Sequence, residues 1–177
     1  MRALVGQGKQ DQAIALLMKS HGAHLHRFAV RMLRDPEAAK EVCQRVFFEA
    51  FQGLPEFRGE GSLLSWLFGI AKHRCIDEIR RRKRAVDTDD LTNAEHRPEL
   101  AVSASEPDFA LEHNLRHCLD ELPPEIRSAV LLRYLGGLTH VEIGEATQVA
   151  AGTIQVQISR ALIKLRKCLR HRGISER

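Results

Sequence analysis

An acidic, proline-containing segment divides this chain of 177 residues into two parts. Residues 87–108 (DTDDLTNAEHRPELAVSASEPD) carry seven acidic side chains, one basic side chain and no sustained apolar period. This composition is typical of a linker rather than of a packed element. If these residues form a flexible coil, their ends lie about 25 Å apart. The sequence therefore predicts two modules, at residues 1–86 and 109–177, joined by a flexible acidic linker.

The net charge of +4 conceals opposed blocks. Residues 1–86 carry 16 basic and 9 acidic side chains (+7), the linker carries 1 and 7 (−6), and residues 109–177 carry 10 and 7 (+3). Two basic modules flanking an acidic linker suit a polyanionic partner. Because no apolar run reaches the roughly 18 residues that span a bilayer and no signal peptide is evident, we expect no membrane insertion and a cytoplasmic location.

Apolar residues recur at helical spacing through the first module. The spacing predicts helices over about residues 11–33, 35–51 and 62–84, with a glycine-punctuated loop at 53–61. Asp35 and Pro36 suit the N-cap and the first position of the second helix. This module also holds seven of the nine aromatic residues, most of which we expect in the core.

The second module shows four helical segments. They cover about residues 109–119, a stretch from Pro124 to a Gly-Gly pair at 136–137, a short helix opened by a Thr139–Glu142 capping box, and a long helix over 151–170. No segment has the period of a strand. The predicted fold class is therefore all-α, with two small helical domains.

The short helix, the turn at 148–150 and the long helix match a helix-turn-helix, whose second helix enters the major groove of DNA. Glutamine can bridge an adenine edge and arginine a guanine edge, while further cations suit phosphates. An exposed amphipathic helix that ends a bundle is the alternative. The residues predicted to contact DNA here are Thr153, Gln155, Gln157, Arg160 and Lys164.

Residues 72–84 form a helix with a cationic end, carrying seven Lys or Arg and two acids. Cations also stabilise a helix C-terminus, which is the structural alternative. Five consecutive cations, however, repel one another more than capping requires, and a polyanion would relieve that repulsion. The glycine-rich loop beside this helix could hold an unstacked base through Arg58. The predicted DNA contacts are Arg58, Lys72, His73, Arg80, Arg81 and Arg82.

The helix over residues 35–51 has a second row of side chains outside its apolar stripe. Glu41, Gln44, Arg45 and Phe48 follow one another at steps of three and four, with a large apolar residue facing outward. Such a row predicts a protein partner, although a lone exposed phenylalanine is common.

Enzymatic and metal-binding functions find little support. His113 and His117 lie one helical turn apart beside Cys118, but no further ligand stands at a supporting spacing. No catalytic carboxylate pair, nucleophilic triad or phosphate loop is evident. The four cysteines, scattered singly, indicate small core residues and no disulfide framework. We expect no enzyme, cofactor or small-molecule substrate.

Taken together, these segments resemble an extracytoplasmic-function (ECF, group IV) sigma factor of the sigma-70 family. Residues 35–47 are similar to region 2.2, residues 57–62 and 66–84 to regions 2.3 and 2.4, and residues 119–124 with the helix-turn-helix to region 4. The resemblance covers about Ile14 to Arg170.

The resemblance implies binding to core RNA polymerase and to promoter DNA, help in opening the duplex, and control by an anti-sigma factor. It places Glu41, Gln44, Arg45 and Phe48 against the polymerase clamp helices. The 57–64 loop and the helix from Trp66 to Arg84 would capture the −10 element, and residues 153–160 would read the −35 element.

The chain departs from the family pattern in two places. Lys40 and Arg45 stand where the family usually has acids, and reversed charge at an interface is costly. Either the cognate polymerase compensates, or Glu37, Glu41 and Glu49 suffice, or binding is conditional. Gln155, Gln157, Gln148 and Ala150 also replace the usual residues of the recognition helix and its turn. A helix-turn-helix regulator that no longer engages polymerase is the alternative function.

Overall fold

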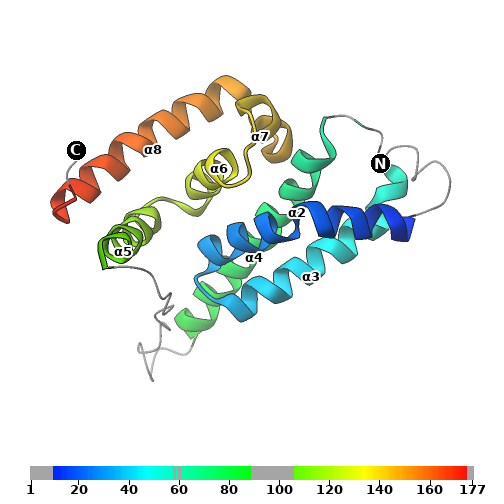
Figure 1. Cartoon of the computed structure of the whole chain (residues 1–177), viewed down its shortest axis with the longest axis horizontal. Coiled ribbons are helices and arrows are strands. Elements are labelled where there is room, and N and C mark those ends of the chain that lie inside the picture. The colour runs from blue at the N-terminus through cyan, green and yellow to red at the C-terminus, as the bar shows by residue number, and fades with distance from the viewer. Residues whose placement is uncertain (1–9, 58, 60, 89–105, 175–177) are drawn as a thin grey trace.

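The computed structural model describes residues 10–57, 59, 61–88 and 106–174 (Figure 1). Helices and turns make up these ranges, which contain no strand. The all-α prediction is therefore confirmed. None of the helices in these ranges is long and apolar enough to cross a bilayer. Most of the predicted linker, residues 89–105, lies outside the described residues.

The described part of the N-terminal module is a bundle of three helices. They are α2 (Gln10–Leu33), α3 (Pro36–Gly53) and α4 (Leu63–Thr88), with a 3-10 turn, η1, at Leu54–Glu56. Phe28 of α2 and Phe68 of α4 are fully buried, and their rings meet edge to face with centroids 5.7 Å apart. The predicted aromatic core is therefore present, and α4 runs one turn beyond its expected end.

The corner between α2 and α3 is set by two adjacent residues. Arg34 takes a left-handed conformation (φ 59°), which reverses the chain. Asp35 then caps α3, since its carboxylate accepts hydrogen bonds from the backbone N–H groups of Glu37 and Ala38, each 3.0 Å long. The predicted N-cap is confirmed.

The described part of the C-terminal module comprises four helices, the first of which begins within the last three residues of the predicted linker. They are α5 (Glu106–Asp120), α6 (Pro124–Tyr134), α7 (His140–Thr147) and α8 (Ala151–His171). The capping box between Thr139 and Glu142 is formed as predicted. Helix α7 ends at Gln148 in a left-handed conformation, and a Cβ on Gly144 would lie 2.6 Å from the Val149 carbonyl oxygen. This tight turn sets α8 against α7 as a helix-turn-helix.

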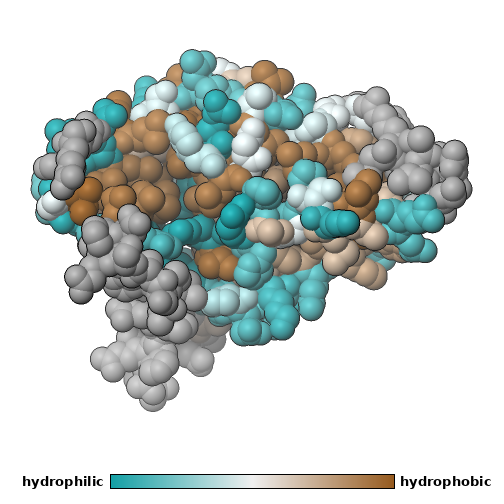
Figure 2. Space-filling view, viewed as in Figure 1, coloured by the Kyte–Doolittle hydropathy of each residue, from teal (hydrophilic) through white to brown (hydrophobic). Residues whose placement is uncertain are grey.

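The expectation of four unpaired cysteines is wrong. Cys118 of α5 and Cys168 of α8 form a disulfide, with Cα atoms 5.8 Å apart. The two residues stand 50 positions apart, and only the packing of α5 along the end of α8 brings them together. Apolar residues gather between these two helices in Figure 2. Cys75 is a buried free thiol as predicted, and burial raises the pKa of the half-buried Cys43 to about 11.

The two modules pack against each other. Helix α4 lies along α7, and α2 lies along α6, so the C-terminal module covers one side of the N-terminal bundle (Figure 1). From the length of the linker, we predicted that the two modules are able to separate. The structure shows the two modules in contact.

Because the disulfide closes a loop of 50 residues, its loss should lower the stability of the C-terminal module by up to about 4 kcal/mol. We expect dithiothreitol to lower the melting temperature of the wild-type protein and to leave that of Cys168→Ser unchanged. Thermal unfolding followed by circular dichroism measures this, with Cys43→Ser as the control that keeps the disulfide. Equal melting of the oxidised and reduced wild type would contradict the expectation.

Candidate nucleic-acid and polymerase interfaces

One side of α4 carries Trp66, Ile70 and His73 at the i, i+4, i+7 spacing of a helix face. Trp66 is half-buried, with its ring centroid 5.2 Å from that of Phe57. The indole therefore lies beside the 57–62 loop, where the resemblance places base capture. Gly59 and Gly61 of that loop take positive φ angles of 76° and 83°. Arg58, which we predicted as a base contact, lies outside the described residues.

This side of α4 borders a cavity of about 410 Å³ at the module junction. Trp66, Gly69, Ile70 and His73 line it from the N-terminal module. Glu145, Ala146 and Gln148 close it from α7 and the turn of the helix-turn-helix. The predicted DNA face of one module thus meets the edge of the other module's predicted DNA-binding motif.

Two titratable side chains on this face, Lys72 and His73, have lowered pKa values. Burial lowers the pKa of Lys72, and the nearby carboxylate of Glu125 opposes this shift. Burial also lowers the pKa of His73, and the neighbouring charge of Lys72 adds to the effect. His73 is therefore biased toward its neutral form at neutral pH.

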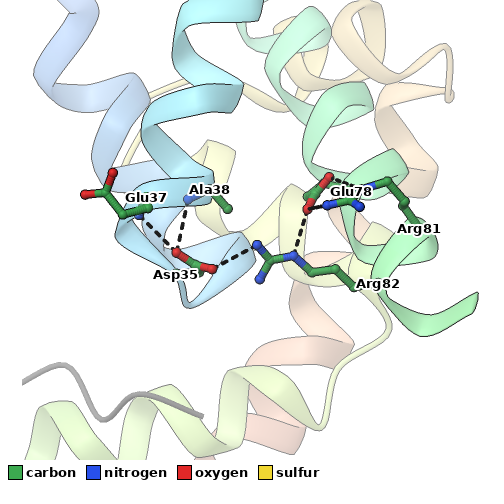
Figure 3. Close-up of polar contacts among 6 residues, drawn as sticks. All are labelled: Asp35, Glu37, Ala38, Glu78, Arg81 and Arg82. Carbon is green, nitrogen blue, oxygen red and sulfur yellow. Dashed lines mark hydrogen bonds and ion pairs between the residues drawn. The ribbon is translucent and has the colours of Figure 1, made fainter. Parts of the chain in front are cut away.

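Acidic side chains pair with the arginines near the end of α4, and this pairing reduces the repulsion among the arginines (Figure 3). Glu78 accepts hydrogen bonds from Arg81 (2.8 and 2.7 Å) and from Arg82 (2.8 Å). Arg82 also donates to Asp35, the N-cap of α3, over 2.9 Å. The hydrogen bonds from Arg81 and Arg82 lower the pKa of Glu78 to about 2. A buried carboxylate therefore neutralises part of the run and ties α4 to α3.

The structural role of these arginines differs from the helix-capping alternative, because α4 has no basic residue in its last turn and the arginines pair with acids instead. Arg82 pairs with both Asp35 and Glu78, and 38% of its side chain is exposed. Arg81 is paired with Glu78 yet keeps 66% of its side chain exposed. Arg80 pairs across the module junction with Glu125. Each of the three arginines named for DNA therefore has an acidic partner within the protein.

The second row on α3 is exposed as the sequence predicted. Glu41, Gln44, Arg45 and Phe48 all face outward, with 61% of Phe48 exposed. Lys40 is exposed beside them. Glu49 was one of the acids expected to compensate for Lys40 and Arg45. It instead accepts a hydrogen bond from Arg74 of α4 over 2.9 Å. The outward face therefore depends on Glu37 and Glu41 for its negative charge.

Helix α8 is strongly two-sided. Ile154, Ile158, Ala161 and Leu165 are buried, and α8 carries no acidic residue. The residues predicted to contact DNA lie on the other side: Thr153, Gln155, Arg160 and Lys164 are exposed and Gln157 is half-buried. Ala150 provides no side-chain cap at the start of α8. The backbone N–H groups of the first turn are therefore left for solvent or for phosphate.

The acidic side of the C-terminal module was not found from the sequence. Glu112, Asp120 and Glu125 pair with cations of the N-terminal module, and Glu142 and Glu145 lie against the start of α4. The net +3 of this module concealed them. One signal for this acidic side was available in the sequence. Helix α8 carries no acidic residue, so the acids of this module lie on its other segments. Within the described residues no group of three metal-ligating side chains forms, and the rings of His113 and His117 contact each other, with centroids 4.6 Å apart.

A helical bundle joined to a helix-turn-helix, with cations on both, is the architecture of a DNA-binding transcription factor. Residues 17–85 match the family model described as Sigma-70 region 2, and residues 112–165 match that described as Sigma-70, region 4. The chain belongs to the sigma-70 family and is an ECF sigma factor, an alternative sigma factor for transcription initiation.

Curated relatives and solved structures agree with this assignment. The chain is 28% identical to the ECF RNA polymerase sigma factor SigW of Bacillus subtilis, over 94% of this chain and 93% of that protein. Its fold is similar to CnrH, solved with the cytosolic domain of CnrY (TM-score 0.72, 20% identity, covering 96% of this chain and 97% of that one). It is also similar to RpoE of Bartonella quintana, solved with the anti-sigma factor NepR (TM-score 0.68, 23% identity, 90% and 96% covered).

The Glu78 cluster predicts a pH-dependent stability. Because the pKa of Glu78 falls from 4.5 to about 2 on folding, its contribution is complete above pH 4.5 and is lost as the pH falls through 2. We expect Glu78→Gln to lower the free energy of unfolding at pH 7 by about 2 kcal/mol. The difference from wild type should vanish near pH 2.

Urea unfolding at several pH values measures this difference. Asp77→Asn is the matched control, since Asp77 is exposed and lies 3.6 Å from its partner Arg74. We expect that control to change stability by less than about 0.5 kcal/mol. A Glu78→Gln penalty that stays constant from pH 7 to pH 2 would contradict an ionic origin.

Proposed function

We propose that this protein is a group IV sigma factor that acts in the cytoplasm. It binds core RNA polymerase, recognises −35 and −10 promoter elements, and helps to melt the promoter. The observation that carries the proposal is the two-sided α8, which presents Thr153, Gln155 and Arg160 outward from a helix-turn-helix. Glutamine and arginine in this position suit direct readout of base edges in the major groove.

The two modules divide the promoter between them. Residues Thr153, Gln155, Gln157, Arg160 and Lys164 of α8 contact the −35 element. Trp66, Lys72 and His73 of α4, with Arg58 and the arginines at 80–82, contact the −10 element. Trp66 supports this assignment because its half-buried ring stands beside a glycine-rich loop that suits an unstacked base.

We assign polymerase docking to the outer face of α3. Glu41, Gln44, Arg45 and Phe48 form an exposed row with one large apolar anchor. Lys40 and Arg45 make this face more basic than the family pattern, and the ion pair of Glu49 with Arg74 removes one compensating acid. The cognate polymerase surface therefore supplies complementary acids, or binding is conditional on a further change in charge.

An anti-sigma factor is the third partner. Of two solved structures of similar fold, one holds the sigma factor RpoE with the anti-sigma factor NepR, and the other holds CnrH with the cytosolic domain of CnrY. The alternative function is a helix-turn-helix regulator that no longer engages polymerase, and the reversed charges at Lys40 and Arg45 favour it.

Transcription with purified components separates these functions. Mapping of transcription starts after overproduction provides a promoter, and we expect core polymerase to initiate there only when this protein is added. Phe48→Asp should abolish co-purification with core polymerase, because Phe48 is the exposed apolar anchor. Met18→Asp on α2, where 50% of the side chain is exposed, is the matched control and should bind normally. Duplex binding without any co-purification of the wild type would favour the alternative regulator.

The recognition helix predicts two kinds of mutant. Gln155→Ala should relax discrimination at one base pair of the −35 element by about 1 to 3 kcal/mol. Lys164→Ala should weaken binding equally to all sequences and reduce the salt slope by about one. Fluorescence anisotropy with promoter and scrambled duplexes at several salt concentrations measures both. A loss of specificity in Lys164→Ala would contradict the assignment of Lys164 to phosphate.

A further inference from the structure

The exposed side of α8 is not uniformly polar. Helix α8 lies along an edge of the molecule, with α5, α6 and α7 packed on its inner side (Figure 1). On the opposite side, Gly152, Val156 and Ser159 follow one another at steps of four and three, and all three are exposed. Val156 is 48% exposed, although Ile154 and Ile158 on either side of it in the sequence are buried. These three exposed residues form an uncharged row, called here the central row of α8.

The side chains of the central row are short, whereas those beside it are long. Gly152 has no side chain, and a Cβ added there would meet no atom within 4 Å. Gln155 stands on one flank of the row, and Gln157 and Arg160 stand on the other. Because the major groove is concave, the outermost row of an inserted helix lies closest to the base edges. Short side chains in that row allow a close approach, while the long side chains reach sideways.

The apolar side chain of Val156 limits what the central row can recognise. Valine neither donates nor accepts a hydrogen bond. Beside a base amino group, ring nitrogen or carbonyl oxygen it would displace water without replacing the lost hydrogen bond, which is costly. Among the four bases, only thymine presents an apolar group in the major groove, its C5-methyl. Thymine is therefore the base that a valine in this position favours.

We propose that Val156 is a specificity-determining residue of the recognition helix, which selects thymine at one position of the −35 element through contact with its C5-methyl group. The proposal rests on the proposed function, which assigns α8 to the −35 element. Gln155 and Arg160 bind the edges of neighbouring base pairs, and Val156 excludes water between them. One thymine of the element is thus read by its methyl group rather than by hydrogen bonds.

A second exposed apolar side chain on the same side of α8 provides a matched comparison. Ile163 stands seven positions after Val156 and is 65% exposed. Seven residues correspond to two helical turns, or about 10 Å along the helix axis. Because the N-terminal residues of a recognition helix contact the base edges, we expect Ile163 to lie beyond the bases. Val156 and Ile163 should therefore differ in their effect on sequence preference.

The first experiment identifies the element without assuming a promoter. Duplexes with a randomised segment are selected by the full-length chain bound to core polymerase, and separately by the full-length chain alone. We expect one position of the selected sequences to favour thymine strongly. Val156→Ser should lose that preference and keep the others, because serine can hydrogen-bond any base. A selected element without thymine on either strand overturns the proposal, as does an unchanged preference in Val156→Ser.

The second experiment tests the methyl group itself. The favoured thymine of a selected duplex is replaced by deoxyuridine, which lacks only the C5-methyl. Fluorescence anisotropy should show that the wild type binds the deoxyuridine duplex about fourfold more weakly, the effect of one apolar carbon left in water. Val156→Ala should bind both duplexes equally, and Ile163→Ala, the matched control, should keep the fourfold ratio.

Three results of this comparison would overturn the proposal. They are equal binding of both duplexes by the wild type, a fourfold ratio that persists in Val156→Ala, and loss of the ratio in both variants. The last result would assign the effect to the whole helix rather than to Val156. Both substitutions introduce alanine, which has the highest helix propensity, and circular dichroism verifies that α8 stays folded.

The outcomes separate failure of the proposal from failure of the proposed function. A chain that initiates with core polymerase but shows no effect of Val156 on the ratio retains the proposed function and overturns the proposal. A chain that never engages polymerase but shows the ratio by itself retains the proposal, as a helix-turn-helix regulator. If neither form of the protein selects any sequence, both the −35 assignment and the role of Val156 are overturned.

Discussion

Helix α4 is the constraint on which the rest of the structure depends, because three of its sides meet different surroundings. Leu67, Phe68, Ala71 and Cys75 are fully buried in the N-terminal bundle. Gly69 admits the backbone of α7. Lys72, His73 and Arg80 lie on the face that we assign to DNA. A helix with one buried side is ordinary, whereas one that also docks a second module needs a small residue at the crossing. The closed arrangement follows from Gly69 and from the acids that face it.

Electrostatics serves both folding and function on this helix. Glu78 and Asp35 take up Arg81 and Arg82, which fastens the end of α4 to the start of α3 (Figure 3). The arginine run is thus part of the bundle as well as the surface that we propose for DNA. Ion pairs also join the modules, because acids of the C-terminal module pair with arginines of the N-terminal module. Exposed pairs of this kind are individually weak, so DNA and polymerase can replace them.

Much of the architecture could be predicted from local sequence. Asp35 with Pro36 and Thr139 with Glu142 mark helix starts through side chains that bond backbone N–H groups within three residues. The inward stripe of α8, from Ile154 to Leu165, is likewise a matter of helical period. The disulfide between Cys118 and Cys168 could not be predicted, since helix packing alone brings together residues 50 positions apart. Helical spacing could have predicted Glu78 as a partner of Arg81 and Arg82, because it stands three and four residues before them. Glu125, the partner of Arg80, and Asp35, the second partner of Arg82, could not be predicted, because they stand 45 and 47 positions away.

By itself, the sequence determined the all-α class, the division into two basic modules and the residues that suit DNA and polymerase, because these depend on helical period, capping chemistry and local charge. The tertiary structure decided which of those residues are available. It exposed the row on α3 and the outer side of α8, and it paired Arg80 of α4 with Glu125, an acid of the other module. The reason is physical: exposure and charge pairing depend on distances between segments, and those distances exist only once the modules have packed.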